Sequence, residues 1–389
     1  MNSILYTGIM VVLWILNLFN GTGLGIAFQT TERARLLIYL IFLIIVITNA
    51  KKNIKPIYYL IIAMPFFFIA VSYLKGYNYM GLHYVSSLML VYILSKLRVN
   101  VNAVRLTGIA YAVMGMAVLV IYDFGSLLSG WNGNSIGMIG LYSYLVFLIP
   151  LYNVKSLSSK IIIIAVTVLY AFLIGPTDSR SCILFAIIGV LFALSILPRR
   201  LIIRTDRRYY LWLLIPLFVA IFVIIVSKGP YMDAINIWSY TNFEKPIFNG
   251  RDKIWEMGFQ KFYADFIMGS GNLNAYNWHN CVIHCLTSYG IIGFILWIVS
   301  FKNILSIGRP WINDIIVQGC IITFIIIYLQ QSVELGLISE SPNLLPYIIL
   351  GMMLGRVKEL NIKNEKASVE QAYEKDNGNN TDLQCGGAS

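Results

Sequence analysis

Residues 209–227 read YYLWLLIPLFVAIFVIIVS, nineteen positions without a charged side chain. Wound into a helix at about 1.5 Å per residue, such a stretch matches the ~30 Å hydrocarbon core of a bilayer. Inside that core no water can satisfy the backbone N–H and C=O groups, so a spanning segment has to be helical. This stretch therefore predicts a membrane-spanning helix, and the rest of the chain is interpreted around it.

The composition of the whole chain is that of a membrane protein with many spans. Of its 389 residues 58% are hydrophobic and 12% are charged, and the mean hydropathy is +0.73. A soluble domain carries about 25% charged residues. The net charge of +11 would raise nucleic acid as a partner in a soluble protein. Here the basic residues cluster between apolar runs, which makes them topological signals, so we expect no nucleic-acid partner.

The apolar runs predict an all-α fold of about twelve transmembrane helices, in one transmembrane domain over residues 1–359. The first run has no basic stretch before it and no cleavage site after it, so we expect a retained span rather than a signal peptide. The runs lie at about 4–19, 36–49, 57–74, 82–95, 105–122, 135–152, 159–174, 181–197, 209–227, 279–299, 314–330 and 342–356.

The distribution of lysine and arginine predicts the orientation. With the N-terminus inside, the inner loops hold fifteen basic residues and the short outer loops hold four. Positive residues favour the cytoplasmic side, so we expect both termini in the cytoplasm and the long loop 228–278 outside. The polar tail, residues 360–389, lacks periodicity and is predicted to be disordered.

The long outer loop carries an unusual group of charged, aromatic and glycine residues. It begins with FNGRDKIW at 248–255, continues with GSG at 269–271 and ends with WHN at 278–280. A second charged turn, GPTDSR at 175–180, precedes the eighth span. Ionisable groups beside membrane spans usually have a function. The topology places Arg180, Arg251 and His279 near the outer surface.

These three side chains could together perform glycosyl transfer on a lipid-diphosphate sugar. Guanidinium groups bind phosphate oxygens in pairs, and a histidine can accept a proton from an attacking hydroxyl. Each also has a plainer interpretation. Arg180 could snorkel at a span end, Arg251 could be a solvated loop charge, and His279 could anchor at the interface beside Trp278.

Other ionisable residues near these three also have more than one interpretation. Asp178 and Asp252 each neighbour one of the arginines and could orient it or simply be solvated. His284 lies about 140° from His279 around a helix, so a metal site from the two is not expected. No acidic cluster with metal-ligand spacing occurs on the outer side. We expect no metal and no cofactor; Asp178, Asp252 and Glu334 would be the ligand candidates if a metal were needed.

The segment from Arg251 to Phe266 has the periodicity of an amphipathic helix. Aromatic residues recur at spacings of three and four, and charged residues alternate with them. We expect a long outer loop that contains an interfacial helix, which lies on the outer membrane interface where it could cover a lipid carrier; the alternative is a helix packed on the bundle.

The motifs, in this order, resemble the O-antigen polymerase and O-antigen ligase superfamily of bacterial envelope proteins. The resemblance covers about residues 175–300, and the first spans match only in general character. The motifs are DSR at 178–180 before a span, NGR at 249–251 with Trp255, GSG at 269–271, HN at 279–280 and GIIG at 290–293. Cys281 and His284 depart from the family, whose segment here is normally plain and aliphatic.

The resemblance implies metal-independent transfer between undecaprenyl diphosphate-linked glycans at the outer face of the bacterial inner membrane. It assigns Arg180 and Arg251 to the diphosphate and His279 to the role of base. The supporting residues are Asp178, Asp252, Asn280 and Trp255. The partners it implies are the lipid-linked glycan and the bilayer, and a polysaccharide chain-length regulator is a candidate partner.

The motifs do not separate a polymerase from a ligase that transfers glycan to lipid A–core. We favour a polymerase of O-antigen, capsule or exopolysaccharide repeats, because such enzymes are commoner and more divergent. A flippase or other transporter is the alternative from a different class. The chain shows no repeat between two halves, and its long loop follows the ninth span on the outer side, which argues against a two-halved transporter.

Overall fold

The computed structural model describes residues 2–19, 30–49, 56–77, 80–123, 132–152, 154–339 and 342–382. All regular secondary structure in these ranges is helical. Each of the twelve apolar segments coincides with a helix. The helices are α1 (Ser3–Phe19), α3 (Thr30–Asn49), α4 (Pro56–Leu74), α5 (Met80–Ser95), α6 (Val101–Asp123), α7 (Gly133–Leu148), η1 (Ile149–Leu151), α8 (Leu157–Ile174), η2 (Gly175–Thr177), α9 (Arg180–Ala193), α10 (Arg200–Ile203), α11 (Asp206–Ser227), α12 (Met232–Phe243), α13 (Arg251–Ala264), α14 (Cys281–Ile307), η3 (Arg309–Trp311), α15 (Ile315–Gln330) and α16 (Leu345–Asp382).

The chain is a helical membrane protein. Among the described residues, five helical stretches are long and apolar enough to cross a bilayer: Val101–Tyr122, Gly133–Leu151, Leu157–Thr177, Asp206–Ser227 and Cys281–Trp311. Shorter apolar helices accompany them: Ser3–Phe19, Ile62–Leu74, Met80–Ser95, Arg180–Ala193 and Ile315–Gln330. The full number of twelve spans stays a prediction.

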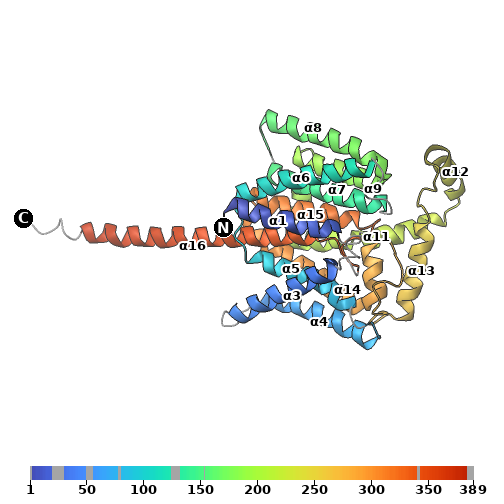
Figure 1. The fold of residues 1–389 in the computed structure, drawn as a ribbon, viewed down its shortest axis with the longest axis horizontal. Coiled ribbons are helices and arrows are strands. Elements are labelled where there is room, and N and C mark those ends of the chain that lie inside the picture. The colour runs from blue at the N-terminus through green and yellow to red at the C-terminus, as the bar shows by residue number, and fades with distance from the viewer. Residues whose placement is uncertain are drawn as a thin grey trace, which may run out of the picture.

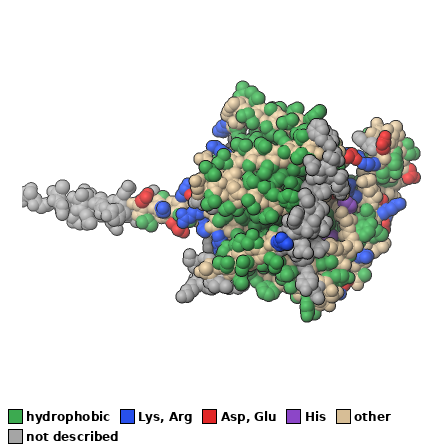
Figure 2. All heavy atoms as spheres, in the orientation of Figure 1, with side chains coloured by type: hydrophobic (Ala, Val, Ile, Leu, Met, Phe, Trp, Pro, Cys, Tyr) green, Lys and Arg blue, Asp and Glu red, His purple; other side chains and the backbone are tan. Residues whose placement is uncertain are grey.

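The helices form a bundle whose two ends differ. The N-terminus and the protruding part of α16 lie at one end, and α12 and α13 lie at the other (Figure 1). Figure 2 shows hydrophobic side chains over the middle of the body, with charged side chains gathered toward the two ends. This is the surface expected of a protein whose middle faces lipid. Which end faces the cytoplasm stays a prediction.

The core of the bundle is built around α15, which is apolar on all sides and almost entirely buried. A helix that is hydrophobic all round belongs in the interior. Small residues let its neighbours come close: a Cβ on Gly319 would lie 2.4 Å from the carbonyl oxygen of Ile149. Close backbone approach at glycine is the usual way that membrane helices pack.

Helix α14 is broken at Gly290, where φ is 64° and ψ is −166°. The break frees the carbonyls of Thr287 and Ser288. These accept hydrogen bonds from the N–H groups of Ser270 (2.9 Å) and Gly271 (2.7 Å). In return, the N–H of Ile291 donates to the carbonyl of Phe266 (2.9 Å). The inserted loop therefore satisfies the backbone groups that a broken helix would otherwise leave without partners inside the protein.

This exchange explains the glycine motifs of the long loop in structural terms. A Cβ on Gly290 would lie 2.3 Å from the carbonyl oxygen of Ile267, and a Cβ on Gly269 would lie 2.5 Å from the backbone of Ser288. Both residues also have positive φ. Only glycine suits a backbone approach this close in that conformation.

The C-terminal helix is longer than expected. Helix α16 continues through the polar residues to Asp382, so the structure departs from the predicted disordered tail over residues 360–382. Nucleation is the costly step of helix formation, and here the apolar first turns supply the nucleus. Glutamate, lysine, alanine and glutamine then extend it with little penalty as far as about residue 375, whereas residues 376–382, which include Gly378 and three asparagines, are weaker helix formers. The pair Glu359–Lys363, one turn apart at 3.5 Å, adds to this.

Candidate active site

The three residues expected in the site lie at the starts of three helices. Arg180 is the first residue of α9, Arg251 is the first residue of α13, and His279 precedes Asn280, the N-cap of α14. Each start follows a left-handed turn, with φ of 53° at Asp178, 76° at Gly250 and 49° at His279 itself. Asp, Asn and His adopt this conformation more readily than other non-glycine residues. A left-handed residue thus lies one or two positions before Arg180 and Arg251, and at His279 itself.

A pocket of about 770 Å³ brings two of these three side chains together. Arg180 and Arg251 both line it, although 71 positions separate them in the chain. The pocket lies where the turns before α7, α9 and α13 and the turn after α15 meet the ends of α6 and α15, the first turns of α7 and α9, and the middle of α11. Its other polar lining residues are Asn132, Asn134, Thr177, Asp178, Ser181, Lys245, Asn249, Ser332 and Glu334.

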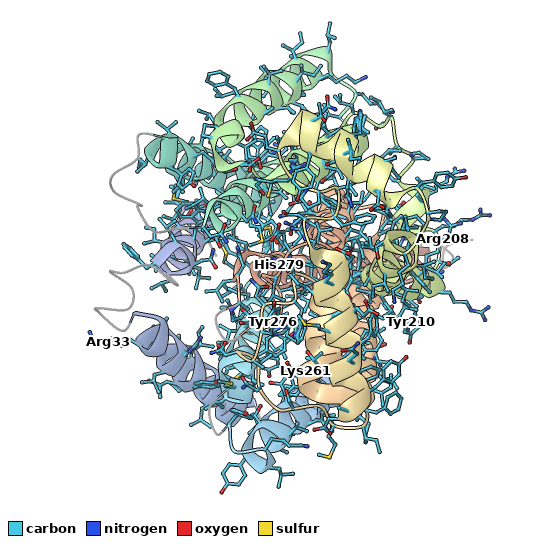
Figure 3. All side chains as sticks on the ribbon, turned by 90° about the vertical axis from the view of Figure 1, so that its right-hand side faces the viewer. Arg33, Arg208, Tyr210, Lys261, Tyr276 and His279 are labelled. Atoms are coloured by element: carbon cyan, nitrogen blue, oxygen red, sulfur yellow. The ribbon has the colours of Figure 1, made fainter. Side chains whose placement is uncertain are left out.

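Glu334 joins the arginine to the histidine. Its Oε1 accepts a hydrogen bond from Nη2 of Arg251 at 3.0 Å, and its Oε2 lies 3.5 Å from Nδ1 of His279. The Glu334 side chain is only 5% exposed, against 21% for Arg251 and 28% for His279. His279 is not in the pocket lining itself; Glu334 connects it to the pocket. Figure 3 looks onto this end and shows His279 near its centre, close to Tyr276.

Several polar atoms at this place have no partner within the described part of the chain. They are Nε of Arg251, Oγ of Ser181 and Oγ of Ser332, all from pocket-lining residues, and Nδ1 of His279 makes no hydrogen bond of acceptable geometry. Buried polar groups in proteins are nearly always paired, with protein, water or ligand. Such a cluster beside a pocket indicates a site for a polar ligand.

The rim of the pocket carries an exposed ion pair between Asp178 and Lys245. Their side chains are 63% and 42% exposed. The hydrogen bond from Lys245 holds the pKa of Asp178 below its ordinary value of 3.8, and the charge of Arg180 acts in the same direction. Asp178 is therefore an anion at neutral pH. It lies beside the cationic pocket, as the prediction that it neighbours Arg180 implies.

Two of the supporting residues serve the fold rather than the pocket. Asn280 is buried and caps α14: its Oδ1 accepts from the N–H of Val282 and Ile283, while its Nδ2 donates to the carbonyls of Pro216 and Ser332. Those two bonds tie the start of α14 to α11 and to the segment that carries Glu334. Asn280 thus fixes the place of His279.

Trp255 has the same kind of role. It is 1% exposed, and its Nε1 donates to the carbonyl of Trp278 at 2.7 Å, directly before His279. Trp278 is itself 2% exposed. The Trp278 indole is therefore inside the protein, whereas the neighbouring His279 side chain is 28% exposed.

The remaining expectations are placed as follows. Asp252 lies in the first turn of α13, where its carboxylate interacts favourably with the helix dipole. It does not line the pocket. The carboxylate that contacts Arg251 is that of Glu334 instead. His284 is buried inside α14, away from the pocket lining. In the described residues, no three or more His, Cys, Asp or Glu side chains gather in a way that could hold a metal ion.

The predicted helix is present as α13 and packs on the bundle, whereas its place at the membrane interface stays a prediction. Helix α13 lies across the ends of the other helices (Figure 1) and buries Trp255, Gly258 and Phe262. A Cβ on Gly258 would lie 2.4 Å from the Ile283 side chain, so the helix sits directly on α14. Tyr263 on its other side is 71% exposed.

Sequence reasoning considered Glu334 only as a metal ligand and did not consider Lys245. The signal for Glu334 was present, because it is one of two carboxylates, with Glu340, in the short connection between two apolar helices. Nothing local indicates its partners, which lie 83 and 55 positions earlier in the chain. Comparison of the chain with models of known families, with curated proteins and with solved structures finds no match.

Proposed function

We propose that this protein is a polymerase of undecaprenyl diphosphate-linked oligosaccharide repeats at the outer face of the bacterial cytoplasmic membrane. The observation that carries the proposal is the shared pocket of Arg180 and Arg251, connected to His279 through Glu334. The motif resemblance to the O-antigen polymerase and ligase superfamily supports it independently.

The pocket has the chemistry that a diphosphate leaving group requires. Two guanidinium groups stabilise negative charge in a partly enclosed site, where electrostatic interactions are stronger than in water. The buried Nε of Arg251, which lacks a partner among the described residues, is a donor that a phosphate oxygen would satisfy. A volume of about 770 Å³ is within the usual range for a ligand site.

The reaction would join two lipid-linked glycans in one displacement. His279 takes the proton from a hydroxyl of the acceptor sugar as that oxygen forms a bond to the anomeric carbon of the donor. The bond from this carbon to the lipid diphosphate breaks, and its electron pair leaves with the diphosphate. Arg180 and Arg251 stabilise the charge that develops there. No metal or cofactor takes part in this proposal.

The position of the pocket favours an enzyme over a transporter. Transporter substrate sites lie near the middle of the membrane, between repeated halves. Here most of the lining comes from helix ends and the turns next to them, at the end of the bundle that carries α12 and α13, while Ile215 and Val219 come from the middle of α11. A lipid-linked repeat could place its diphosphate there while its chain stays in the bilayer.

Reconstitution tests the proposal directly. Purified protein in proteoliposomes should convert an undecaprenyl diphosphate-linked repeat into a ladder of longer glycans on a gel, also in the presence of EDTA. A ligase would form product only when lipid A–core is added. A flippase would move the lipid-linked repeat across the vesicle membrane without lengthening it, and either of those results would refute the polymerase.

The proposed orientation has a separate test. Reporter fusions at Asn249 and in the C-terminal tail should report opposite sides of the membrane, with Asn249 outside. A cytoplasmic signal at Asn249 would remove the pocket from the face where the proposed substrate is used.

A further inference from the structure

The carboxylate of Glu334 has one oxygen for each of two neighbours. Oε1 pairs with Nη2 of Arg251 at 3.0 Å, and Oε2 faces Nδ1 of His279 at 3.5 Å. With only 5% of its side chain exposed, Glu334 has little access to water. A buried carboxylate needs such partners, because burying a charge alone is costly.

The segment that carries Glu334 is held rigidly. The amide of Gln331 accepts hydrogen bonds from the N–H groups of Gly336 (2.6 Å) and Leu337 (2.7 Å) on the far side of Glu334. The same amide donates to the hydroxyl of Tyr142 at 2.7 Å, and the carbonyl of Gln331 accepts from the N–H of Cys281 at 3.0 Å. The turn from 331 to 337 is therefore closed by one side chain and tied to α7 and α14.

The histidine is held from its other side. The side chain of Asn277 accepts a hydrogen bond from the N–H of His279 at 3.0 Å. The next residue, Asn280, donates from its side-chain Nδ2 to the carbonyl of Ser332 at 3.0 Å. The Glu334 turn and the His279 turn are thus joined by backbone and side-chain hydrogen bonds. The closeness of Oε2 to Nδ1 follows from these bonds and not from a surface encounter of two mobile side chains.

We propose that Glu334 is a positioning residue that sets the tautomer of His279 and at the same time orients Arg251. A carboxylate next to Nδ1 favours the proton on that nitrogen, which leaves Nε2 as the basic atom. The same carboxylate holds one edge of the guanidinium through Nη2 and leaves Nε for a ligand. The base and the diphosphate contact are thereby kept in one fixed geometry, which is what accelerates a bimolecular step.

This inference rests on the proposed function for its kinetic consequence, while its structural core can be tested without any substrate. The chain has three histidines, so a ¹⁵N-imidazole spectrum of the purified protein contains three sets of signals. The signals of His279 are assigned by their loss in His279→Gln. At a pH where the ring is neutral, the ¹⁵N shifts of wild type should report the Nδ1–H tautomer.

Three substitutions separate the two roles of Glu334. Glu334→Ala removes both contacts, so the His279 signals should shift toward the Nε2–H tautomer. Glu334→Gln keeps an oxygen that can accept from Nδ1–H but loses the charge, so the tautomer should persist. Glu256→Gln is the matched control, because Glu256 is also a carboxylate paired with a cation, Lys228 at 2.7 Å, but lies outside the pocket.

Kinetics with a lipid-linked repeat provide the second readout. In Glu334→Ala, Arg251 loses its counter-ion but can still bind the diphosphate, so KM should change by less than about threefold. His279 loses its orientation, so kcat should fall by about 10²–10⁴-fold, the range for lost general-base catalysis. Glu334→Gln should lose less, and Glu256→Gln should match wild type. A purely structural role would instead lower the amount of folded protein and raise KM.

The two readouts distinguish failure of this inference from failure of the polymerase proposal. If Glu334→Ala keeps both the wild-type tautomer and the wild-type kcat, Glu334 does not position His279, whatever the reaction is. If the tautomer changes but wild type makes no polymer from any repeat supplied, the positioning role stands and the polymerase proposal fails. A wild-type spectrum that already shows the Nε2–H tautomer overturns the inference directly.

Discussion

The pocket contains two pairs of a carboxylate and a cation that differ mainly in burial. Glu334 and Arg251, on its wall, are 5% and 21% exposed; Asp178 and Lys245, on its rim, are 63% and 42% exposed. Water and salt screen the rim pair, so it contributes about 0–1 kcal/mol to stability. The wall pair is screened much less, and breaking it leaves an uncompensated charge. Pairs of the same chemistry therefore should have very different consequences, and the following changes test this.

The largest effect is expected at the two arginines that line the pocket, Arg251 of the wall pair and the exposed Arg180. Arg251→Ala and Arg180→Ala should abolish polymer formation in cells while membrane expression persists. Arg251→Lys and Arg180→Lys should restore little, because an ammonium group cannot bind two phosphate oxygens side by side. The measurement is the glycan ladder on a gel, normalised to protein in the membrane.

Lys228 is the control for these changes, since it is a cation of the same loop that pairs with Glu256 away from the pocket. Lys228→Ala should give a normal ladder. Normal long-chain glycan from both lysine variants at 180 and 251 would show that paired phosphate contacts are not needed.

His279→Ala should have the next largest effect. Loss of a general base lowers the rate by about 10²–10⁴-fold. Single lipid-linked repeats should then accumulate, and long chains should disappear from the ladder. His284→Ala should cost far less activity, because His284 is buried in α14 and does not line the pocket. A normal ladder from His279→Ala would exclude it as the base.

A change behind the wall should act mainly on stability. Asn280→Ala removes the N-cap of α14 and the two donor bonds to Pro216 and Ser332. Loss of a cap alone costs about 0.5–2 kcal/mol, and the stranded buried carbonyls add to it. We expect a lower melting temperature in detergent, together with reduced activity from a displaced His279. Unchanged melting would mean that these bonds do not hold the wall.

The smallest effect is expected at the rim. Lys245→Met removes the hydrogen bond that lowers the pKa of Asp178 below 3.8. A carboxyl whose pKa is lower in the folded state stabilises the protein above its unfolded pKa, and this contribution disappears as pH falls through the folded pKa. The melting temperature of Lys245→Met should thus be slightly below wild type at pH 6, and the difference should begin to shrink below about pH 4 and disappear only below the folded pKa of Asp178.

Salt offers an independent check on the rim. The small difference at pH 6 should shrink further at high ionic strength, since exposed pairs are screened within about a Debye length. A large difference that resists salt would show that the rim pair behaves like the wall pair, and the comparison based on burial would fail.

Much of the fold was accessible from the sequence because membrane helices are defined locally. An apolar run such as 209–227 has to be helical wherever it sits in the bilayer, and α11 covers it at Asp206–Ser227. The periodicity of residues 251–266 likewise predicts α13. The extent of α16 was not accessible, since composition alone does not show that an apolar start nucleates the polar residues that follow it.

The candidate site likewise has features that the sequence predicts and features that depend on distant contacts. Charge asymmetry and residue type were enough to select Arg180, Arg251 and His279, because ionisable residues are rare and conspicuous in an apolar chain. The structural role of GSG at 269–271 could not be predicted, because this segment forms hydrogen bonds with the broken part of α14, about twenty residues later. Asn280 and Trp255 were grouped with the site, although their bonds hold the backbone around it.

The sequence by itself determined that the chain is a helical membrane protein and which side chains could carry charge chemistry beside it. Only the tertiary structure decided that Glu334 lies between Arg251 and His279, and that Arg180 shares a pocket with Arg251. The physical reason is range. Helix formation in a bilayer depends on hydrogen bonds four residues apart, whereas the contacts of Glu334 depend on how α9, α13, α14 and α15 pack.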